Sequence, residues 1–474
     1  HFGAVDQWCR VWVNGECAGD HMGGYLPFTF DITDMLRDGE NELRVLVRDD
    51  SDTGYHAKGK QRLRAEGMYY TAQSGIWQTV WLEWVPDTYI EKLGIDIDYD
   101  NRQLKITADL NQPGDKIPAI LQMPGPNGHI LIGSCADRKM TFHADISTYE
   151  EWTPDDPKLH PIRLRIGTDD VESYFAVRKF SVERQEDGKH RFCLNGSPLF
   201  LNGVLDQGYW PEGLYTAPGD AALVQDIENM KACGFNMMRK HCKLEPLRWY
   251  YHCDRLGMIV WQDLVSGGEN TNVWWTTYLP TFIKKMQSGS FWRARPCGRM
   301  SEKGRNEWLG EARETVELLS NTPSLATWVI FNEGWGQFST REVTETVRKW
   351  DPSRPVDAAS GWFDFGCGDY DSRHIYFSEL ACPEDSKERA AVISEYGGVT
   401  LSCPGHVFSD AAYGYHVMKS CGELREAFER FQDKLKELQK EGLSGAVYTQ
   451  VSDIEEEING IYTYDRKICK LKEE

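Results

Sequence analysis

The first part of the chain alternates apolar and polar residues with a period of two, which predicts β-strands. Val11–Val13 is followed by Asn14-Gly15, a strong signal for a two-residue hairpin turn. The same alternation predicts further strands at 28–32, 43–47, 76–82, 104–108 and 162–166. We therefore expect two β-sandwiches, over residues 1–87 and 88–182.

From about residue 183 the pattern changes to strands that alternate with helices. The predicted strands lie at 197–205, 235–239, 258–261 and 325–331, near Val356, Ile375 and Ala391, and at 445–449. The predicted helices lie at 221–233, 245–256, 307–319, 340–350 and 422–442. Eight strands alternating with helices favour a (β/α)₈ barrel over an open sheet, so we expect a multidomain protein with all-β and α/β parts and a barrel over residues 183–474.

Composition limits the classes of function. The chain has 474 residues, 53 Lys plus Arg and 73 Asp plus Glu, which gives a formal net charge of −20. This charge repels phosphate backbones and anionic lipids, so we expect no nucleic-acid or membrane partner. The 13 cysteines form no C-x-x-C pair, which indicates reduced thiols and a cytoplasmic protein. Aromatic residues make up 12% of the chain and modestly favour a sugar ligand.

Two glutamates follow predicted barrel strands, where barrel enzymes carry their active residues. Glu333 follows the apolar strand 325–331, and Glu395 follows Ala390–Ile393. A charge directly after an apolar strand is costly to desolvate, so its presence there indicates that the residue has a role. Two such carboxylates suit glycosidic bond cleavage, one protonated and the other ionised. Their separation decides between retention and inversion of configuration, and the sequence leaves it open.

Several segments resemble glycoside hydrolase family 2, the family of β-galactosidases, β-glucuronidases and β-mannosidases. They are Gly23-Gly24-Tyr25, 74–82, 234–239, 253–257, Asn332-Glu333-Gly334 and 394–398. The resemblance implies a jelly-roll, an immunoglobulin-like sandwich and a TIM barrel that form a retaining exo-β-glycosidase. It implies that Glu333 is the acid/base and Glu395 the nucleophile, with β-galactosides as the preferred substrates. The alternatives are β-glucosidase, β-mannosidase, β-glucuronidase or an inactive carbohydrate-binding protein.

The resemblance also implies substrate-binding residues. Asn332 matches the residue that holds the sugar 2-hydroxyl, and Tyr376 the residue that hydrogen-bonds the nucleophile. The other candidates near strand ends are Arg239, His241, His374, Asp206 and Trp210. Trp210 could stack on a sugar ring or pack beneath a loop, and a histidine such as His241 is often structural.

The chain departs from the family pattern in three places. The run Glu455–Glu457, which we expect to be a solvated loop, stands where glucuronidases have an Asn-x-Lys motif, so we disfavour a uronate substrate. Gln450 follows the last strand where many relatives have tryptophan. Only about 87 residues precede the second sandwich, so we expect the first jelly-roll strands to lie outside this sequence. No metal pattern is recognisable, so we expect neither metal nor cofactor; relatives often form homo-oligomers.

Overall fold

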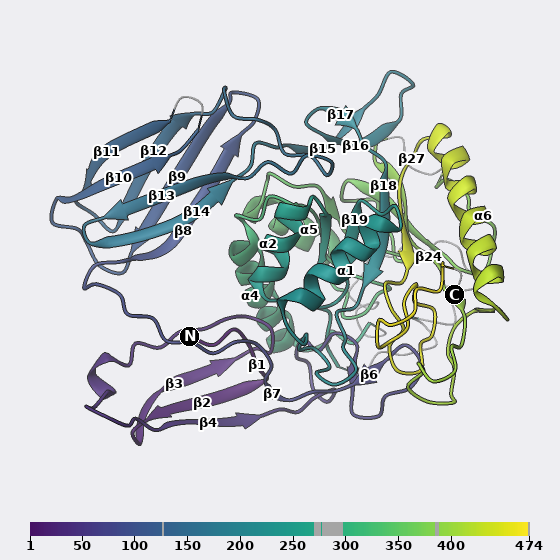
Figure 1. Cartoon of the computed structure of the whole chain (residues 1–474), viewed down its shortest axis with the longest axis horizontal. Helices are drawn as coiled ribbons and strands as arrows, with labels where there is room; N and C mark the ends of the chain where they lie inside the picture. The colour runs from purple at the N-terminus through teal and green to yellow at the C-terminus, as the bar shows by residue number, and fades with distance from the viewer. Residues whose placement is uncertain (126–127, 270–275, 277–296, 384–387, 473–474) are drawn as a thin grey trace.

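The structure, a computed structural model, describes residues 1–125, 128–269, 276, 297–383 and 388–472. Figure 1 shows a small N-terminal sheet at the lower left, an antiparallel sandwich at the upper left and a barrel at the right. Two β units followed by a barrel confirm the expected fold class. No helix in the described part is long and apolar enough to cross a membrane.

The N-terminal part contains a three-stranded antiparallel sheet of order β3-β2-β4. Its strands are β2 Trp8–Val13, β3 Glu16–Met22 and β4 Leu43–Arg48. The predicted turn is confirmed, because Asn14 (φ 54°) and Gly15 (φ 85°) both have positive φ. Short pairs join β1 Val5–Asp6 to β7 Gly75–Ile76 and β5 Gln61–Arg62 to β6 Tyr70–Thr71.

Two strand predictions in this part were wrong. Phe28 makes one isolated bridge to Phe2, and the chain then enters the 3-10 helix η1 Thr33–Met35 instead of a strand. Phe28 stacks on Phe2 and on His21, so ring contacts, and not a strand ladder, partly bury its apolar ring. In the predicted strand 76–82, only Ile76 belongs to a strand, β7, and Val80 makes an isolated bridge to Phe2.

The middle part is a sandwich of two antiparallel sheets, β12-β9-β8 and β11-β10-β13-β14. Its strands are β8 Ile90–Asp98, β9 Gln103–Leu110, β10 Ile117–Met123, β11 His129–Cys135, β12 Lys139–Asp145, β13 His160–Ile166 and β14 Asp169–Phe175. Alternate residues of β9, such as Leu104 and Ile106, are fully buried against Leu121 and Leu164 of the facing sheet. The sandwich is therefore confirmed, while the divisions at residues 87 and 182 remain predictions.

The barrel contains eight parallel strands in the order β22-β21-β20-β19-β18-β27-β24-β23. The strands are β18 Leu201–Asp206, β19 Met237–Lys240, β20 Ile259–Asp263, β21 Leu325–Val329, β22 Val356–Asp357, β23 Tyr370–Ile375, β24 Ala390–Gly397 and β27 Leu443–Thr449. The helices of the described part are α1 Asp220–Ala232, α2 Leu247–Leu256, α4 Glu302–Leu319, α5 Thr340–Trp350 and α6 Cys421–Lys440. The first and last strands of this order, β22 and β23, are joined by a hydrogen bond from Asp369 N, just before β23, to Val356 O of β22 (2.8 Å).

A small sheet covers the end of the barrel at which the strands begin. The predicted strand 197–205 is divided, because Ser197–Pro198 (β17) pairs with β16 His190–Leu194, which pairs with β15 Phe180–Arg184. Phe180 and Phe192 pack in one cluster with residues of the barrel strands such as Trp261. The opposite end, where the strands finish, is therefore the end at which a site can open.

The run Glu455–Glu457 joins the barrel to the N-terminal part. Our prediction of a solvated loop was wrong, because Glu455 is 4% exposed and Glu457 is 3% exposed. The Glu455 carboxylate accepts from Thr71 N, Glu456 accepts from Gly67 N, and Glu457 accepts from the Tyr70 hydroxyl. Glu455 and Glu457 can thus be buried, because the N-terminal part supplies donors to their carboxylates.

Candidate active site

The two predicted catalytic glutamates lie together at the open end of the barrel. Glu395 is within β24, and Glu333 follows β21. Glu333 has a φ of 49°, a left-handed conformation that costs free energy for a non-glycine residue and that clusters at functional sites. Its backbone N–H donates to Ser360 O (3.0 Å), which holds this conformation in place.

His374 lies between the two carboxylates. Its Nδ1 is 2.9 Å from Glu333 Oε1 and 3.4 Å from Glu395 Oε2. One oxygen of each carboxylate and one ring nitrogen of His374 lie within 4.8 Å of one another. Its Nε2 is 2.8 Å from Ser360 Oγ. This close approach suits a retaining glycosidase, whose carboxyl groups are about 5–5.5 Å apart, better than an inverting one at about 6.5–9.5 Å.

Glu395 is held in its ionised form. Burial acts to raise its pKa, but the positive charges of His374 and Arg239 outweigh burial and lower the pKa below its ordinary value. Arg239 Nη1 donates to Glu395 Oε1 (3.2 Å), and the Tyr376 hydroxyl donates to Oε2 (2.6 Å). Burial and the nearby Glu395 charge raise the pKa of Tyr376, so this hydroxyl keeps its proton. An ionised, oriented carboxylate can act as a nucleophile.

A buried charge network supports this side of the site. Arg239 is fully buried and donates through Nε and Nη2 to both oxygens of Asp263 (2.9 and 3.0 Å). His241 Nδ1 lies 2.7 Å from Asp263 Oδ2. Burial opposes a charge on His241, but Cys242 and Asp263 raise its pKa to about 9, so the imidazole is protonated at neutral pH.

Asn332 presents an unused donor to the site. Its Oδ1 accepts from Arg239 Nη2 (2.9 Å), which orients the amide. Its Nδ2 is buried and has no hydrogen-bond partner among the described residues. Buried polar groups without a partner are rare, and here a sugar hydroxyl would supply the missing acceptor.

Asp206 and Trp210 are occupied by other parts of the protein. Asp206 Oδ2 pairs with Lys240 Nζ (2.5 Å), and its Oδ1 accepts from Gly208 N (2.8 Å). Trp210 is 5% exposed, and the Arg466 guanidinium lies over its ring at 4.1 Å. Of the nine predicted residues, the structure therefore brings together the glutamate pair and five others, and places Asp206 and Trp210 in neighbouring packing.

Sequence reasoning missed other residues of this site. Asp263 ends the buried strand β20, so the rule that selected the two glutamates could have found it. Trp362 packs edge-on against His374 (5.1 Å between centroids), and Trp335 lies near His241 (6.4 Å). The ring nitrogens of both tryptophans are buried without partners in the described part of the chain. Aromatic walls with free N–H groups suit a sugar, which has apolar faces and polar edges.

Two clusters in the described residues hold enough donor atoms for a metal ion. One contains Glu333, His374 and Glu395, and the other contains His241, Cys242 and Asp263. In the second, the Arg239 guanidinium donates to both oxygens of Asp263 and already neutralises that carboxylate. This cluster does not fit a cation, and the expectation of no metal remains a prediction.

Comparison with known proteins places the chain in a family. The model of the TIM barrel domain of glycosyl hydrolases family 2 matches residues 186–470, more than half of the chain. The chain belongs to this family. The model of the sugar binding domain of glycosyl hydrolases family 2 matches residues 1–86.

Individual relatives agree with the family assignment. A β-galactosidase from Lactococcus lactis is 26% identical over 76% of this chain and 33% of its own length. A putative β-glucuronidase from Formosa agariphila is 27% identical over 58% of this chain and 34% of its own. The chain thus spans about a third of the length of these curated relatives.

Solved structures share the fold. A family 2 β-galacturonidase from Eisenbergiella tayi superposes with a TM-score of 0.69 at 19% identity, over 99% of this chain and 84% of that one. A β-D-glucuronidase from Dictyoglomus thermophilum gives a TM-score of 0.72 at 17% identity, with the same coverage of 99% and 84%. At such identities the likeness concerns the fold.

Proposed function

We propose that the protein is a retaining exo-β-glycosidase that removes β-linked sugars from non-reducing ends. The observation that carries this proposal is the approach of the Glu333 and Glu395 carboxylates to within 4.8 Å, with His374 between them. The alternative of an inactive carbohydrate-binding protein gives no reason for two buried carboxylates at this spacing.

The reaction proceeds by double displacement. Glu395 attacks the anomeric carbon while Glu333 gives its proton to the leaving oxygen, so the glycosidic bond breaks as a covalent glycosyl ester forms. Glu333, now ionised, takes a proton from water, and the resulting hydroxide oxygen displaces Glu395 and yields the free sugar. Tyr376 and Arg239 orient the nucleophile, and Asn332 Nδ2 binds the sugar 2-hydroxyl.

The substrates we propose are β-galactosides. Support comes from the curated relatives, among which the protein from Lactococcus lactis is a β-galactosidase. The β-glucosides, β-mannosides and β-glucuronides remain alternatives within the same mechanism. The free state of all 13 cysteines supports the proposed cytoplasmic location, and a homo-oligomer remains an expectation.

The mechanism is tested with aryl β-glycosides. Glu395→Ala and Glu333→Gln should each lower kcat/KM by at least about 10³-fold, because each removes a group that acts in the transition state. Proton NMR of the parent reaction should show the β-anomer of the released sugar first. Initial release of the α-anomer would contradict retention, and variants as active as the parent would contradict both assigned roles.

A further inference from the structure

A basic segment of the N-terminal part enters the open end of the barrel. Lys58, Lys60 and Arg62 alternate along it. The backbone N–H groups of Lys58 and Gly59 donate to Ser266 O, just beyond β20 (3.0 and 2.9 Å). Gly59 has a φ of 57°, and a Cβ there would lie 2.6 Å from Cys242 O, so the two backbones meet closely. The segment is therefore fixed against the barrel beside His241.

Lys60 is buried but lacks a counter-ion in the described part of the chain. It is 6% exposed, and its Nζ lies over the rings of Tyr70 (5.6 Å) and Trp335 (5.8 Å). No described carboxylate lies within ion-pair distance, and no described side chain or backbone atom hydrogen-bonds this ammonium. The aromatic faces stabilise the cation only partly.

Other buried lysines of the described part have partners: Lys58 Nζ donates to the backbone oxygen of Asp52 (2.7 Å), and three lysines are paired with carboxylates. Lys240 contacts Asp206 (2.5 Å), Lys243 contacts Glu245 (2.8 Å) and Lys470 contacts Asp453 (2.6 Å). A buried charge without a partner is costly, and a ligand of opposite charge would remove that cost. Lys60 therefore differs from these three lysines in having its charge available.

Lys60 lies within electrostatic range of the glutamate pair. Its charge is close enough to act, with those of His374, Arg239 and His241, in lowering the pKa of Glu395. The tryptophan beneath it, Trp335, stands two residues after Glu333 and has a buried ring nitrogen without a partner in the described part. A ligand that touches both glutamates therefore comes near the ammonium.

The acidic run behind Lys60 does not compete for it. Glu457 accepts from the Tyr70 hydroxyl and from Asn459 Nδ2 (3.0 Å), and Glu455 accepts from Thr71 N. These carboxylates fix the strand β6, whose Tyr70 carries the ring under Lys60. These hydrogen bonds hold the Glu455 and Glu457 carboxylates toward the N-terminal part, so the sequence argument against an acidic sugar is weaker than it was.

We propose that Lys60 binds a negatively charged substituent, a carboxylate or a sulfate, on the substrate sugar. This inference rests on the proposed glycosidase function and narrows its substrates to anionic β-galactosides. The ammonium would form a charge-assisted hydrogen bond with the oxyanion in a site largely closed to water, where such bonds are strong. It would also attract that anion against the net charge of −20 of the chain.

The test compares three aryl glycosides: the β-galactoside, the β-galacturonide and the 6-sulfo-β-galactoside. The parent should prefer one anionic substrate, and which one it prefers distinguishes carboxylate from sulfate. Lys60→Met should lower kcat/KM for that substrate by about 10- to 100-fold but for the neutral one by less than about 3-fold. Lys60→Arg should retain part of the preference.

The control is Lys105→Met, which removes the same charge from an exposed lysine of β9. It should leave all three substrates unchanged. An equal loss on neutral and anionic substrates in Lys60→Met, or a parent that prefers the neutral galactoside, would overturn the proposal.

A binding measurement separates this proposal from the catalytic one. Galacturonate, galactose 6-sulfate and galactose are titrated into the parent and into Lys60→Met by calorimetry. Tighter binding of one anionic sugar that is lost in the variant supports Lys60 even if no glycoside is hydrolysed, an outcome that would refute only the proposed reaction. The thermal unfolding of Lys60→Met is measured first, to establish that the variant is folded as stably as the parent. If this variant then binds the anionic sugars as tightly as the parent does, the role of Lys60 is refuted.

Discussion

Tyr376 links the nucleophile to the barrel wall. Its hydroxyl donates to Glu395 Oε2 (2.6 Å) and lies 2.8 Å from Thr449 Oγ1 of β27. The hydrogen bond stabilises the ionised carboxylate and fixes the oxygen that would attack the sugar. Removing the hydroxyl should therefore affect both the rate and its pH dependence.

Tyr376→Phe should lower kcat about 10- to 100-fold, because the ring remains while the oriented hydrogen bond is lost. The acid limb of the profile of kcat/KM against pH should move to higher pH, since Glu395 loses a donor that favours its ionised form. Phe377→Leu, a change at an exposed neighbouring ring, is the control. If kcat falls but the acid limb of the pH profile does not move, the tyrosine does not influence the ionisation of Glu395.

Single residues of the site were predictable to different degrees. Glu333 and Glu395 stand out because they follow apolar strands, and the family pattern adds Asn332 and Tyr376. Lys60 gave no signal, because its neighbours in the sequence belong to an N-terminal hairpin region while its role depends on Trp335 far along the chain. The role of a charged residue that depends on contacts with a distant segment cannot be predicted from the local sequence pattern.

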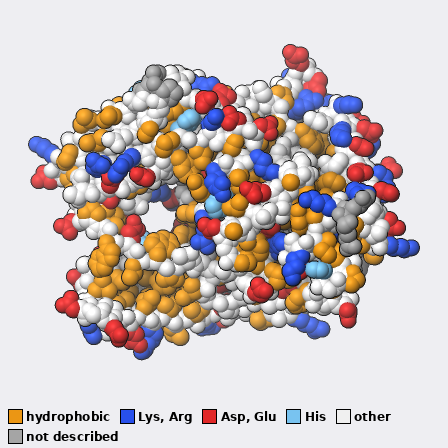
Figure 2. Space-filling view, viewed as in Figure 1, with side chains coloured by type: hydrophobic (Ala, Val, Ile, Leu, Met, Phe, Trp, Pro, Cys, Tyr) orange, Lys and Arg blue, Asp and Glu red, His pale blue; other side chains and the backbone are white. Residues whose placement is uncertain are grey.

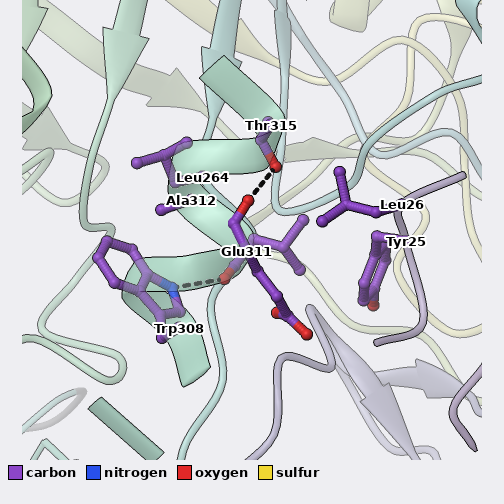
Figure 3. Close-up of a pocket in the computed structure, with 8 residues that line it drawn as sticks. Tyr25, Leu26, Leu264, Trp308, Glu311, Ala312 and Thr315 are labelled. Atoms are coloured by element: carbon purple, nitrogen blue, oxygen red, sulfur yellow. Dashed lines mark hydrogen bonds between the residues drawn. The ribbon is translucent and has the colours of Figure 1, made fainter. Parts of the chain in front are cut away.

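At the scale of elements, helix α4 faces the N-terminal part across a small pocket (Figure 3). The pocket is lined by Tyr25 and Leu26 on one side and by Trp308, Glu311, Ala312 and Thr315 of α4 on the other. Burial, followed by the charge of Glu307, raises the pKa of Glu311 to about 8. A Cβ at Gly23 would lie 2.9 Å from Glu311 Oε1, so the carboxyl group points at the N-terminal chain.

Glu311 should make stability fall with rising pH. Its pKa is about 8 in the folded chain against an ordinary 4.5, so between these values the folded state holds more protons than the unfolded state. Glu311→Gln should therefore raise the free energy of unfolding by about 1–2 kcal/mol at pH 9 and have little effect at pH 5. Thermal unfolding at both pH values measures this, with Glu345→Gln on the exposed face of α5 as the control. The same shift at both pH values would contradict the assignment.

The elements themselves were largely predictable. Barrel strands such as Leu325–Val329 are mostly apolar because both of their faces are buried, and such runs are distinctive. The predictions failed where contacts over long sequence distances decide, as for the Glu457–Tyr70 pair, which is 387 positions apart. Three glutamates in a row resemble a solvated loop unless their donors are known.

At the scale of the whole molecule, apolar side chains gather on the surface of the N-terminal part, as Figure 2 shows at the lower left. Leu43 and Leu46 of β4 are 53% and 52% exposed, and Leu82 and Trp84 are 70% and 84% exposed. Contiguous exposed apolar surface favours association with other surfaces in water.

The chain should therefore associate with itself as its concentration rises. Replacing both leucines, Leu43→Lys with Leu46→Lys, should reduce concentration-dependent light scattering and leave the hydrolysis of aryl glycosides within about 2-fold, because neither side chain is near the barrel site. A double change of Glu437→Lys and Lys440→Gln, in exposed positions of α6, is the control. Scattering that does not change in the leucine variant would show that this surface is not responsible.

The placement of Lys60 puts catalysis and substrate selection in different parts of the sequence. The carboxylates that would break the bond belong to barrel strands, whereas the ammonium that would select the sugar belongs to the segment between β4 and β6. Recombination that exchanged only this N-terminal segment would thus change the substrate specificity while the catalytic barrel stayed the same. A new substrate specificity could then evolve without an intermediate that has lost catalytic activity.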